Sequence, residues 1–517
     1  MIHEIKKHSL YAFYDLSVAP LTFDFLQFLV LADIERSKKK LSDLTVVIIP
    51  ATEETRDPGL KDRFSRSDRN WRLSQILAPA CALLPSCSGK VMICGSREDG
   101  ANVVEFAGNN IFPLHYTIES PVACFQLAEV VAAYACGESI PSLKATSQAT
   151  EIIQQWIQAR ASKKNVISIT LREAPYGEEK NSNIAAWGQF ARNLIERDYF
   201  PVIIRDTYKA LGSTPEALTG IQTFGEASIN IDLRMAFYQA SYLNLFTNGG
   251  PQVLCHLNQD TRCLVFKPLV KNWHDSTKFG LTRGAGVQIG EQINFLPPNQ
   301  LWIWQDDDYA NIHHYFEKMA SVLELEARLG SSSKIVSKNV GEREPIEKLL
   351  TRLESNNSWA AAAKILKYLL DENPNEFNVL YRLGVCEVWT NQLVLAAKHF
   401  ELASEIDGSN NDLLIAMGDL AVKRGDTHDA IIQYRRVLNL NPENARAYIR
   451  LGMLLDTIGE LDSAATMFEN ALRYCPYDQK IMRLYARFLE KIGNSEKAEK
   501  LLAEAEKIEP QTREISL

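Results

Sequence analysis

Several features that the sequence lacks narrow the class of this protein. Its nine cysteines form no Cys-x-x-Cys pair, so neither a structural zinc site nor a disulfide framework is indicated, and reduced, mostly buried thiols are expected. Positive charge is not in excess, because 56 lysines and arginines stand against 64 aspartates and glutamates. A general nucleic-acid binder needs a basic face to neutralise phosphates. We therefore expect no nucleic-acid partner.

Long apolar runs and a leader segment are also missing. Residues 1–16 contain no apolar core before a small-residue cleavage site. The longest apolar stretch nearby, residues 23–34, is interrupted by Asp24, Gln27 and Asp33 and is too short to span a bilayer. These features predict a cytoplasmic protein without a transmembrane segment.

What the sequence does contain is a 34-residue period in its last third. A small residue recurs at Gly384, Gly418, Gly452 and Ala486, and alanine recurs at Ala362, Ala396, Ala430, Ala464 and Ala498. A large apolar residue recurs at Leu366, Phe400, Tyr434, Phe468 and Leu502, and a helix breaker at Pro374, Gly408, Pro442, Pro476 and Pro510. Four columns that share one period indicate a repeated structural unit.

This pattern resembles the tetratricopeptide repeat (TPR), a pair of antiparallel helices. The small residue lies where the two helices cross closely, and proline ends the second helix. Phased in this way, five repeats occupy residues 343–512 and begin near Arg343, Phe377, Asn411, Ala445 and Gln479. We predict an α-solenoid there, preceded by a Ser/Lys-rich linker at residues 331–342.

Two α/β patterns precede the linker. Apolar, β-branched segments at residues 11–14, 44–50 and 90–94 alternate with helical ones, and the pattern restarts with strands at 165–171, 200–205 and 242–247. Such alternation predicts parallel sheets covered by helices on both faces. The predicted fold is α/β followed by all-α. It has two Rossmann-like domains facing a cleft, at residues 1–145 and 146–330, and then the solenoid.

The second domain carries the sharpest candidate site. Ligands of open parallel sheets bind at the carboxyl ends of the strands. There, a strand runs into Asn248, Gly249, Gly250 and Pro251 before a helix, and glycines ahead of a helix start can present N–H groups to an anion. Three cations at other strand ends could neutralise a diphosphate: Arg172, Arg205 and Lys267. A plain strand–helix turn with surface cations is the alternative.

The strand–Asn-Gly-Gly-Pro–helix segment resembles the donor-phosphate turn of bacterial B-type (GT-B) glycosyltransferases, including the heptosyltransferase-like group. Residues 167–173 also resemble the first donor-domain strand of that fold. The resemblance implies that residues 1–145 form the acceptor side and residues 146–330 the nucleotide-sugar donor domain. In the family pattern a His follows the glycine by three residues, whereas Val253 stands there and His256 comes later. A retaining-enzyme Glu-x₇-Glu motif is absent, which favours an inverting enzyme.

An inverting transferase needs a base for the acceptor hydroxyl and cations for the departing diphosphate. The base should come from the first domain, where Asp15 and Glu98 follow predicted strands, with Arg97 and Glu119 near such ends. No metal is needed if Arg and Lys carry the charge, and no cofactor beyond the nucleotide sugar is expected. The run of acids at residues 306–308 is interpreted as a solvated loop or helix cap.

The solenoid should recruit a protein partner or acceptor through the first helix of each pair. Its predicted partner-binding residues are Tyr381, Trp389, Ile415, Asp419, Ile449, Arg483 and Arg487. The alternative is that the array packs on the other domains or on a second copy of itself, as a homo-oligomer. For the whole chain, we predict a glycosyltransferase. The alternatives are a non-catalytic TPR scaffold that retains the fold and an epimerase or dehydrogenase. The last is disfavoured because no Gly-x-Gly-x-x-Gly follows the first strand of either domain.

Overall fold

The computed structural model describes residues 8–52, 55–56, 65–270, 278–329 and 346–508. The chain divides into two compact units, residues 1–365 and residues 366–517, and each is considered by itself. The predicted linker and the first predicted repeat start, Arg343, lie outside the described residues. Among the described helices, none combines the length and the apolar character that a membrane span requires. The cytoplasmic location remains a prediction.

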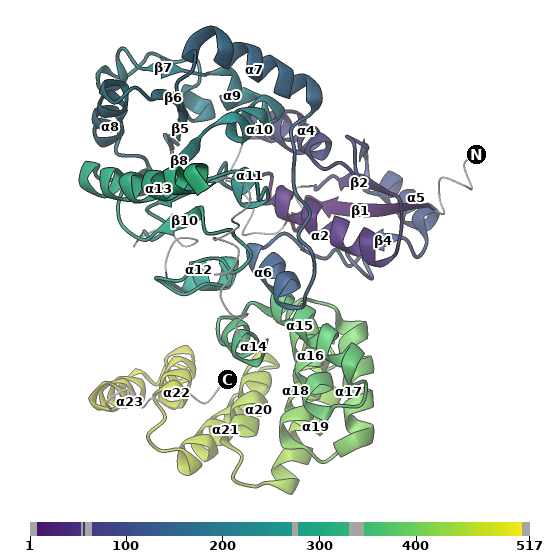
Figure 1. Cartoon of the computed structure of the whole chain (residues 1–517). Helices are drawn as coiled ribbons and strands as arrows, with labels where there is room; N and C mark the ends of the chain where they lie inside the picture. Colours follow the sequence, from purple (N-terminus) through teal and green to yellow (C-terminus); the bar gives the residue numbers. More distant parts are fainter. Residues whose placement is uncertain (1–7, 53–54, 57–64, 271–277, 330–345, 509–517) are drawn as a thin grey trace. The chain divides into compact units, whose positions relative to one another are not determined.

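The first lobe of unit 1 is built on a four-stranded parallel sheet in the order β3-β2-β1-β4. Its strands are β1 (Ser9–Asp15), β2 (Asp43–Ile49), β3 (Val91–Ile93) and β4 (Ile111–Phe112). Alternate side chains of β1 point to opposite faces. Tyr14 packs on Phe25 and Phe28 of helix α2 (Phe25–Lys38), whereas Tyr11 and Phe13 join the apolar cluster of α5 (Arg97–Ala107). The sheet is therefore covered on both faces (Figure 1).

The second lobe holds a six-stranded sheet, also parallel throughout, in the order β10-β9-β8-β5-β6-β7. The strands are β5 (Val166–Thr170), β6 (Phe200–Ile204), β7 (Gln222–Thr223), β8 (Leu243–Thr247), β9 (Cys263–Phe266) and β10 (Gln300–Ile303). Helices α8 (Ile184–Glu196) and α13 (Tyr309–Leu329) share one apolar core with β5, β6, β8 and β9. The order reverses between β5 and β8, so the strand ends diverge there and leave a crevice.

The remaining helices of unit 1 cover the sheets and connect the lobes. They are α3 (Arg66–Arg72), α4 (Ala78–Ala80), α6 (Leu127–Ala135), α7 (Ser147–Ala161), α9 (Glu226–Ile229), α10 (Ile231–Ala240), α11 (Val253–His256), α12 (Lys278–Ala285) and α14 (Ile346–Ser355). Short turns η2 (Leu73–Leu77), η3 (Cys81–Leu83), η4 (Glu178–Lys180), η5 (Thr207–Lys209) and η6 (Glu216–Leu218) lie between them. Helix α10 packs against α7, β5 and α11, which places it beside the reversal point of the second sheet.

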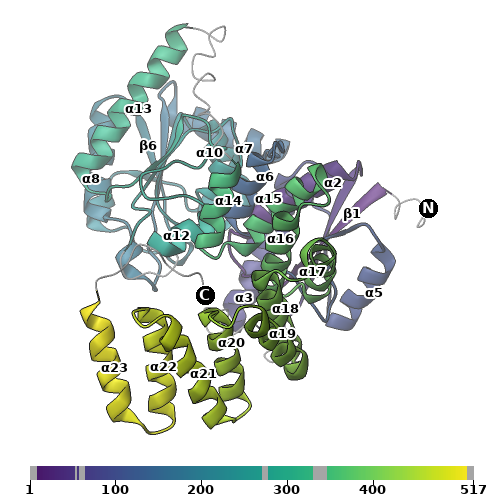
Figure 2. The same cartoon turned by 90° about the horizontal axis from the view of Figure 1, so that it is seen from below.

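The carboxyl-terminal third is all helical. The boundary between the units falls within α15 (Trp359–Glu372). The helices that follow are α16 (Phe377–Trp389), α17 (Leu393–Asp407), α18 (Asn411–Arg424), α19 (Thr427–Leu440), α20 (Ala445–Thr457), α21 (Leu461–Tyr474), α22 (Gln479–Lys491) and α23 (Ser495–Lys507). Four of the five predicted repeat starts coincide with the first residue of α16, α18, α20 and α22. Figure 2 shows these helices as successive antiparallel pairs.

The glycine column explains why the two helices of a repeat approach so closely. A methyl group added to Gly384 would meet the ring of Phe400, and one added to Gly418 would meet the ring of Tyr434. At Gly452 the nearest atom would be Cβ of Met467, at 3.2 Å. The glycine of the first helix therefore receives the aromatic ring of the second helix of the same repeat, which a side chain would displace.

Candidate functional site

A cleft of about 880 Å³ opens in unit 1 at the carboxyl ends of the second sheet. The residues that follow β5, β6 and β8 form one side of the cleft, as expected for the reversal point of an open parallel sheet. Residues 20–27, 72–76 and 125–127 of the first lobe form the other side. Helix α12 adds Gly280, Leu281, Gly284 and Ala285. The cleft thus has walls from both lobes.

Basic side chains outnumber acidic ones on the cleft wall. Five lining residues are cationic, namely Arg72, Arg172, Lys180, Arg205 and Arg234, and two are acidic, Asp24 and Asp206. In a recess of low dielectric, such an excess favours an anionic ligand. The acidic charge of the whole chain therefore does not extend to this cleft.

Two of the predicted donor-binding arginines reach the cleft but are already engaged. Arg205 is buried at the end of β6 and forms a bidentate ion pair with Glu173, at 2.9 and 2.5 Å. Arg172 donates to the carbonyl oxygens of Gly177 and Tyr176 and to the side chain of Asn181. Burial lowers the pKa of Arg172. The two guanidiniums hold the loop after β5 in place, and their role toward a diphosphate stays a prediction.

The Asn-Gly-Gly-Pro turn also lies on the wall, with a geometry that differs from the expectation. Helix α11 after it has four residues only, and the N–H of Gly249 donates to Oε1 of Gln252 at 3.0 Å. Asn248 accepts from the same glutamine at 2.9 Å. A Cβ on Gly250 would come within 2.5 Å of the ring of Phe23. Gly250 thus admits the ring of Phe23 from the first lobe, and a side chain at this position would displace that ring.

Lys267 lies away from the lining residues of the cleft, although it follows β9 as predicted. Its Nζ donates to the carbonyl of Asn181 at 3.2 Å and lies 3.9 Å from Asp307. Asp307 is buried and accepts from Thr247 and from Trp187 at 2.8 and 2.9 Å. Within the acidic run at residues 306–308, Asp308 caps α13, in line with the interpretation as a helix cap. Asp307 instead is buried and links β8 to α8 through its hydrogen bonds.

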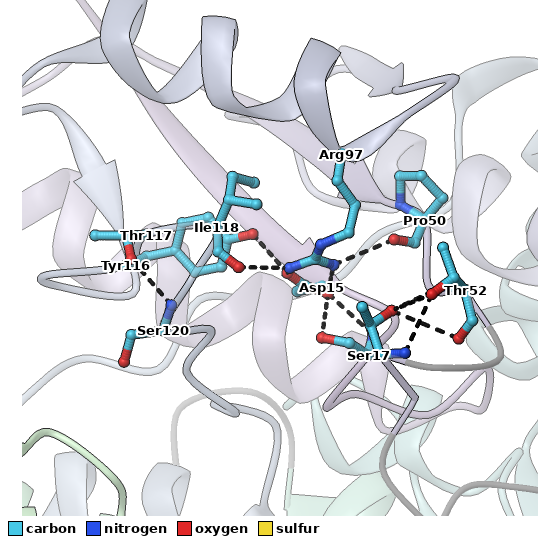
Figure 3. Close-up of polar contacts among 10 residues, drawn as sticks. Asp15, Ser17, Pro50, Thr52, Arg97, Tyr116, Thr117, Ile118 and Ser120 are labelled. Carbon is cyan, nitrogen blue, oxygen red and sulfur yellow. Dashed lines mark hydrogen bonds and ion pairs between the residues drawn. The ribbon is translucent and has the colours of Figure 1, made fainter. Parts of the chain in front are cut away.

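The two predicted bases lie outside the cleft lining of the described residues. Asp15 is buried, and its carboxylate accepts from Arg97 at 2.9 and 3.0 Å, from Tyr116 at 2.7 Å and from Ser17 at 2.6 Å (Figure 3). Burial and the charge of Asp15 raise the pKa of Tyr116. Glu98 is exposed in the first turn of α5. Neither position favours proton transfer in the cleft, and their catalytic role is untested.

Most lining residues were not among the predicted site residues, and three of these carry titratable side chains that bear on the chemistry of the cleft. Asp24 is the carboxylate that the first lobe contributes to the wall, and Arg234 is a buried cation of α10. His256 is buried and accepts from Nε1 of Trp302 at 3.3 Å. Burial lowers the pKa of His256 to about 3, so its ring is neutral. None of the three directly follows a strand. The other candidates were chosen because they follow predicted strands, so this criterion could not identify these three. Among the described residues, no group of three or more His, Cys, Asp and Glu side chains is arranged to hold a metal ion.

In unit 2, two predicted partner-binding residues are wrong because they are inaccessible. Ile415 is 0% exposed and Ile449 is 1% exposed, since both pack in the core between repeats. Tyr381 and Asp419 are half-buried, whereas Trp389, Arg483 and Arg487 are exposed. The exposed three remain candidates for partner contact.

The acidic residues of the array are paired with basic residues of the next repeat. Asp412 meets Arg446 at 3.0 Å, Asp419 meets Arg450 at 3.1 Å, and Asp456 meets Lys491 at 2.6 Å. Each pair joins the first helices of neighbouring repeats. The carboxylates of Asp412, Asp419 and Asp456 are thus paired within the array.

The array matches a known protein family, and two curated proteins are similar to part of the chain. Family models for the tetratricopeptide repeat match residues 415–478 and 458–516. The chain is 24% identical over 135 residues to the BBSome complex member BBS4 of Bos taurus, covering 26% of each protein. It is 29% identical over 120 residues to the TPR repeat-containing protein MJ1428 of Methanocaldococcus jannaschii, covering 23% of this chain and 20% of that protein. The matches therefore span about a quarter and a fifth of these relatives.

Solved structures of other proteins are similar to about a third of the chain. A thermophilic TPR protein of Thermus thermophilus, TTC0263, is 18% identical with a TM-score of 0.30, covering 32% of this chain and 91% of that one. MamA from Desulfovibrio magneticus RS-1 is 17% identical with a TM-score of 0.27, covering 32% and 92%. On the family models, residues 415–516 of the chain are a stretch of tetratricopeptide repeats, and such repeats indicate a role in protein interaction.

Proposed function

We propose that unit 1 is a glycosyltransferase of the GT-B type, in which two Rossmann-like lobes bind a nucleotide-diphosphate sugar in the cleft between them. The observation that carries the proposal is the cationic cleft at the reversal point of the second sheet. If β5 is numbered 1 and β10 is numbered 6, the strand order of that sheet from β7 to β10 is 3-2-1-4-5-6. Doubly wound folds with this order bind nucleotides at the point where the order reverses.

The reaction class follows from the charges on the two walls. In an inverting transfer, the acceptor oxygen attacks the anomeric carbon, its proton passes to a base, and the bond to the diphosphate breaks with the electron pair on the leaving oxygen. Cations of the second lobe stabilise that oxygen. Asp24 is the carboxylate that the first lobe brings to the cleft wall, so it replaces Asp15 and Glu98 as the first base to test.

The test is calorimetry of the full chain with UDP, GDP and ADP, followed by donor turnover with the sugar nucleotide of any base that binds. Saturable binding with a Kd in the micromolar range supports the proposal. Asp24→Asn should keep donor binding and lower transfer by about 10²–10⁴-fold, as loss of a general base does. Failure of all three nucleotides to bind would overturn the proposal.

A non-catalytic, TPR-bearing scaffold is the second candidate. The specific observation in its favour is that Asp15, one of the two predicted bases, has its carboxylate engaged by Arg97, Tyr116 and Ser17. A scaffold that retains the fold would bind a nucleotide without turning over its sugar. Binding that is equal in wild type and Asp24→Asn, with no donor turnover in either, supports this second candidate.

The proposal also gives the tetratricopeptide repeats a role in binding a protein. An array of this kind binds a peptide or a docked domain and carries no chemistry of its own. We propose that it brings a protein acceptor or an assembly partner to the transferase. Trp389, 48% exposed with Nζ of Lys423 5.4 Å from its ring centroid, is the largest accessible aromatic among the predicted contact residues.

A further inference from the structure

One buried arginine of the cleft has no carboxylate partner among the described residues. Arg234, on α10, is 4% exposed and lines the cleft. Its Nε donates to the carbonyl of Ala227 at 2.5 Å, and among the described residues no carboxylate lies within ion-pair distance of its guanidinium. By contrast, Arg97, Arg205 and Arg352 are paired with Asp15, Glu173 and Glu291.

A buried charge without a counter-ion destabilises a fold, because transfer from water is not offset by attraction to an opposite charge. The ring of Phe23, with its centroid 5.9 Å from the guanidinium carbon, offsets only part of that cost. The two terminal nitrogens of the guanidinium, each with two N–H groups, find no acceptor in the part of the chain that the structure describes. The site is therefore built for a charge that comes from outside the chain.

A second unsatisfied donor lies on the neighbouring helix. Nε2 of His256 accepts from Trp302, so the proton of the neutral ring is on Nδ1. Nδ1 is buried and has no hydrogen-bond partner among the described residues. Helix α11, which carries His256, packs against α10, and both residues belong to the cleft wall. Buried donors without acceptors are rare in folded proteins and call for a partner.

We infer that Arg234 is the anion-binding residue of the cleft and that its ligand group is a phosphate of the bound nucleotide. This inference rests on the proposed function. It assigns phosphate binding to α10 rather than to Arg172, Arg205 and the Asn-Gly-Gly-Pro turn. A phosphate supplies several acceptor oxygens and the missing negative charge, and the planar guanidinium fork matches two of those oxygens at once.

The experiment compares binding and stability in the same variants of the full chain. Calorimetry measures the affinity for UDP, GDP, ADP and inorganic pyrophosphate in wild type, Arg234→Gln, Arg234→Met and Arg262→Gln. Arg262 is the matched control. It donates to one carbonyl and lies over the ring of Tyr242, but it precedes β9 and is at the opposite end of the sheet.

We expect at least a tenfold loss of affinity in both Arg234 variants and a change below twofold in Arg262→Gln. The Tm of ligand-free Arg234→Met should be equal to or above that of wild type, because an uncompensated buried charge is removed. A merely structural arginine would instead lower the Tm and leave the affinity of the folded fraction unchanged.

The outcomes separate this inference from the proposed function. Unchanged nucleotide binding in Arg234→Gln, or an equal loss in Arg262→Gln, overturns the role of Arg234 and leaves the nucleotide site in place. Pyrophosphate binding that depends on Arg234, with no binding of any nucleoside diphosphate, supports the anion site and overturns the nucleotide-sugar function. The absence of binding by every probe overturns both.

Discussion

The polar groups of the two units are satisfied in different ways. In the repeat array, Asp412, Asp419 and Asp456 each find a cation on the next repeat, and Tyr434 donates to Asp419 at 2.6 Å. In the cleft of unit 1, Arg234 and His256 keep donors without acceptors among the described residues. The carboxylates of these three acids are thus paired within the array, whereas the guanidinium of Arg234 in the cleft has no carboxylate partner among the described residues. That unpaired cation is the group that a bound anion would satisfy.

The largest expected effect tests this comparison in unit 1, at Asp15, a buried acid whose carboxylate has hydrogen-bond partners within the chain. Asp15→Ala should lower the free energy of unfolding by about 3–5 kcal/mol, because it leaves Arg97 and Tyr116 without their acceptor. Urea unfolding of the full chain, followed at the transition of unit 1, measures this loss. Asp24→Ala is the control, at an acid that is half-buried on the cleft wall, and it should cost much less. A stable Asp15→Ala variant without transferase activity would restore Asp15 as the base.

The next effect concerns how closely the two helices of a repeat pack at the glycine column of the array. Gly418→Ala should be less stable than Gly452→Ala by about 1–3 kcal/mol, because the added methyl meets the ring of Tyr434 at one site and looser contacts at the other. The two variants share the same column, so any gain in helix propensity is common to both. Thermal unfolding followed by circular dichroism makes the comparison. Equal stability would show that the ring moves aside without cost.

A smaller effect comes from the neutral His256. Its pKa is about 3 in the folded chain against 6.5 for an ordinary histidine. Below pH 6.5 the unfolded chain therefore binds a proton that the folded chain does not. The stability is complete above that pH and falls by up to about 1.4 kcal/mol per pH unit as the pH is lowered toward about 3. Urea unfolding at about pH 7 and pH 5 should show a smaller loss in His256→Gln than in wild type, and parallel losses would contradict the buried neutral ring.

The smallest effect tests how much the pairs between repeats contribute. Lys491→Met removes the partner of Asp456, and the lysine side chain is 58% exposed. Such an exposed pair should contribute less than about 1 kcal/mol and should weaken in salt. A double-mutant cycle with Asp456→Asn measures the coupling directly. A coupling well above about 1 kcal/mol would mean that charge pairs, rather than the apolar columns, hold successive repeats together.

The array could be predicted from the sequence because its interactions repeat at a fixed spacing. The residues at Phe377, Asn411, Ala445 and Gln479 begin helices as the period required. The parallel strands were also predictable, since their β-branched runs are buried on both faces. In both cases the information is local or periodic.

The cleft was predicted less well because its determinants lie far apart along the chain. Asp15 lies at the end of a strand, where a catalytic acid can lie. The sequence around it does not indicate that its partner is Arg97, 82 residues later. Gly250 looked like a phosphate turn, yet its close neighbour is Phe23 of the other lobe. Arg234 lies within a helix, where no turn or glycine marks it, and its burial results from packing of distant elements. The isoleucines Ile415 and Ile449 failed for the same reason, because the next repeat covers them.

The contact of Phe23 with Gly250 has a consequence for how fast a ligand can enter. The ring occupies the space that even a methyl group on that glycine would need, so a ligand group that packs directly on Gly250 requires the ring, or the lobe that carries it, to withdraw. Association would then be limited by a unimolecular opening step, and its observed rate would level off as the ligand concentration rises. Truncation of the ring in Phe23→Ala would convert this plateau into a linear dependence, which stopped-flow fluorescence can resolve.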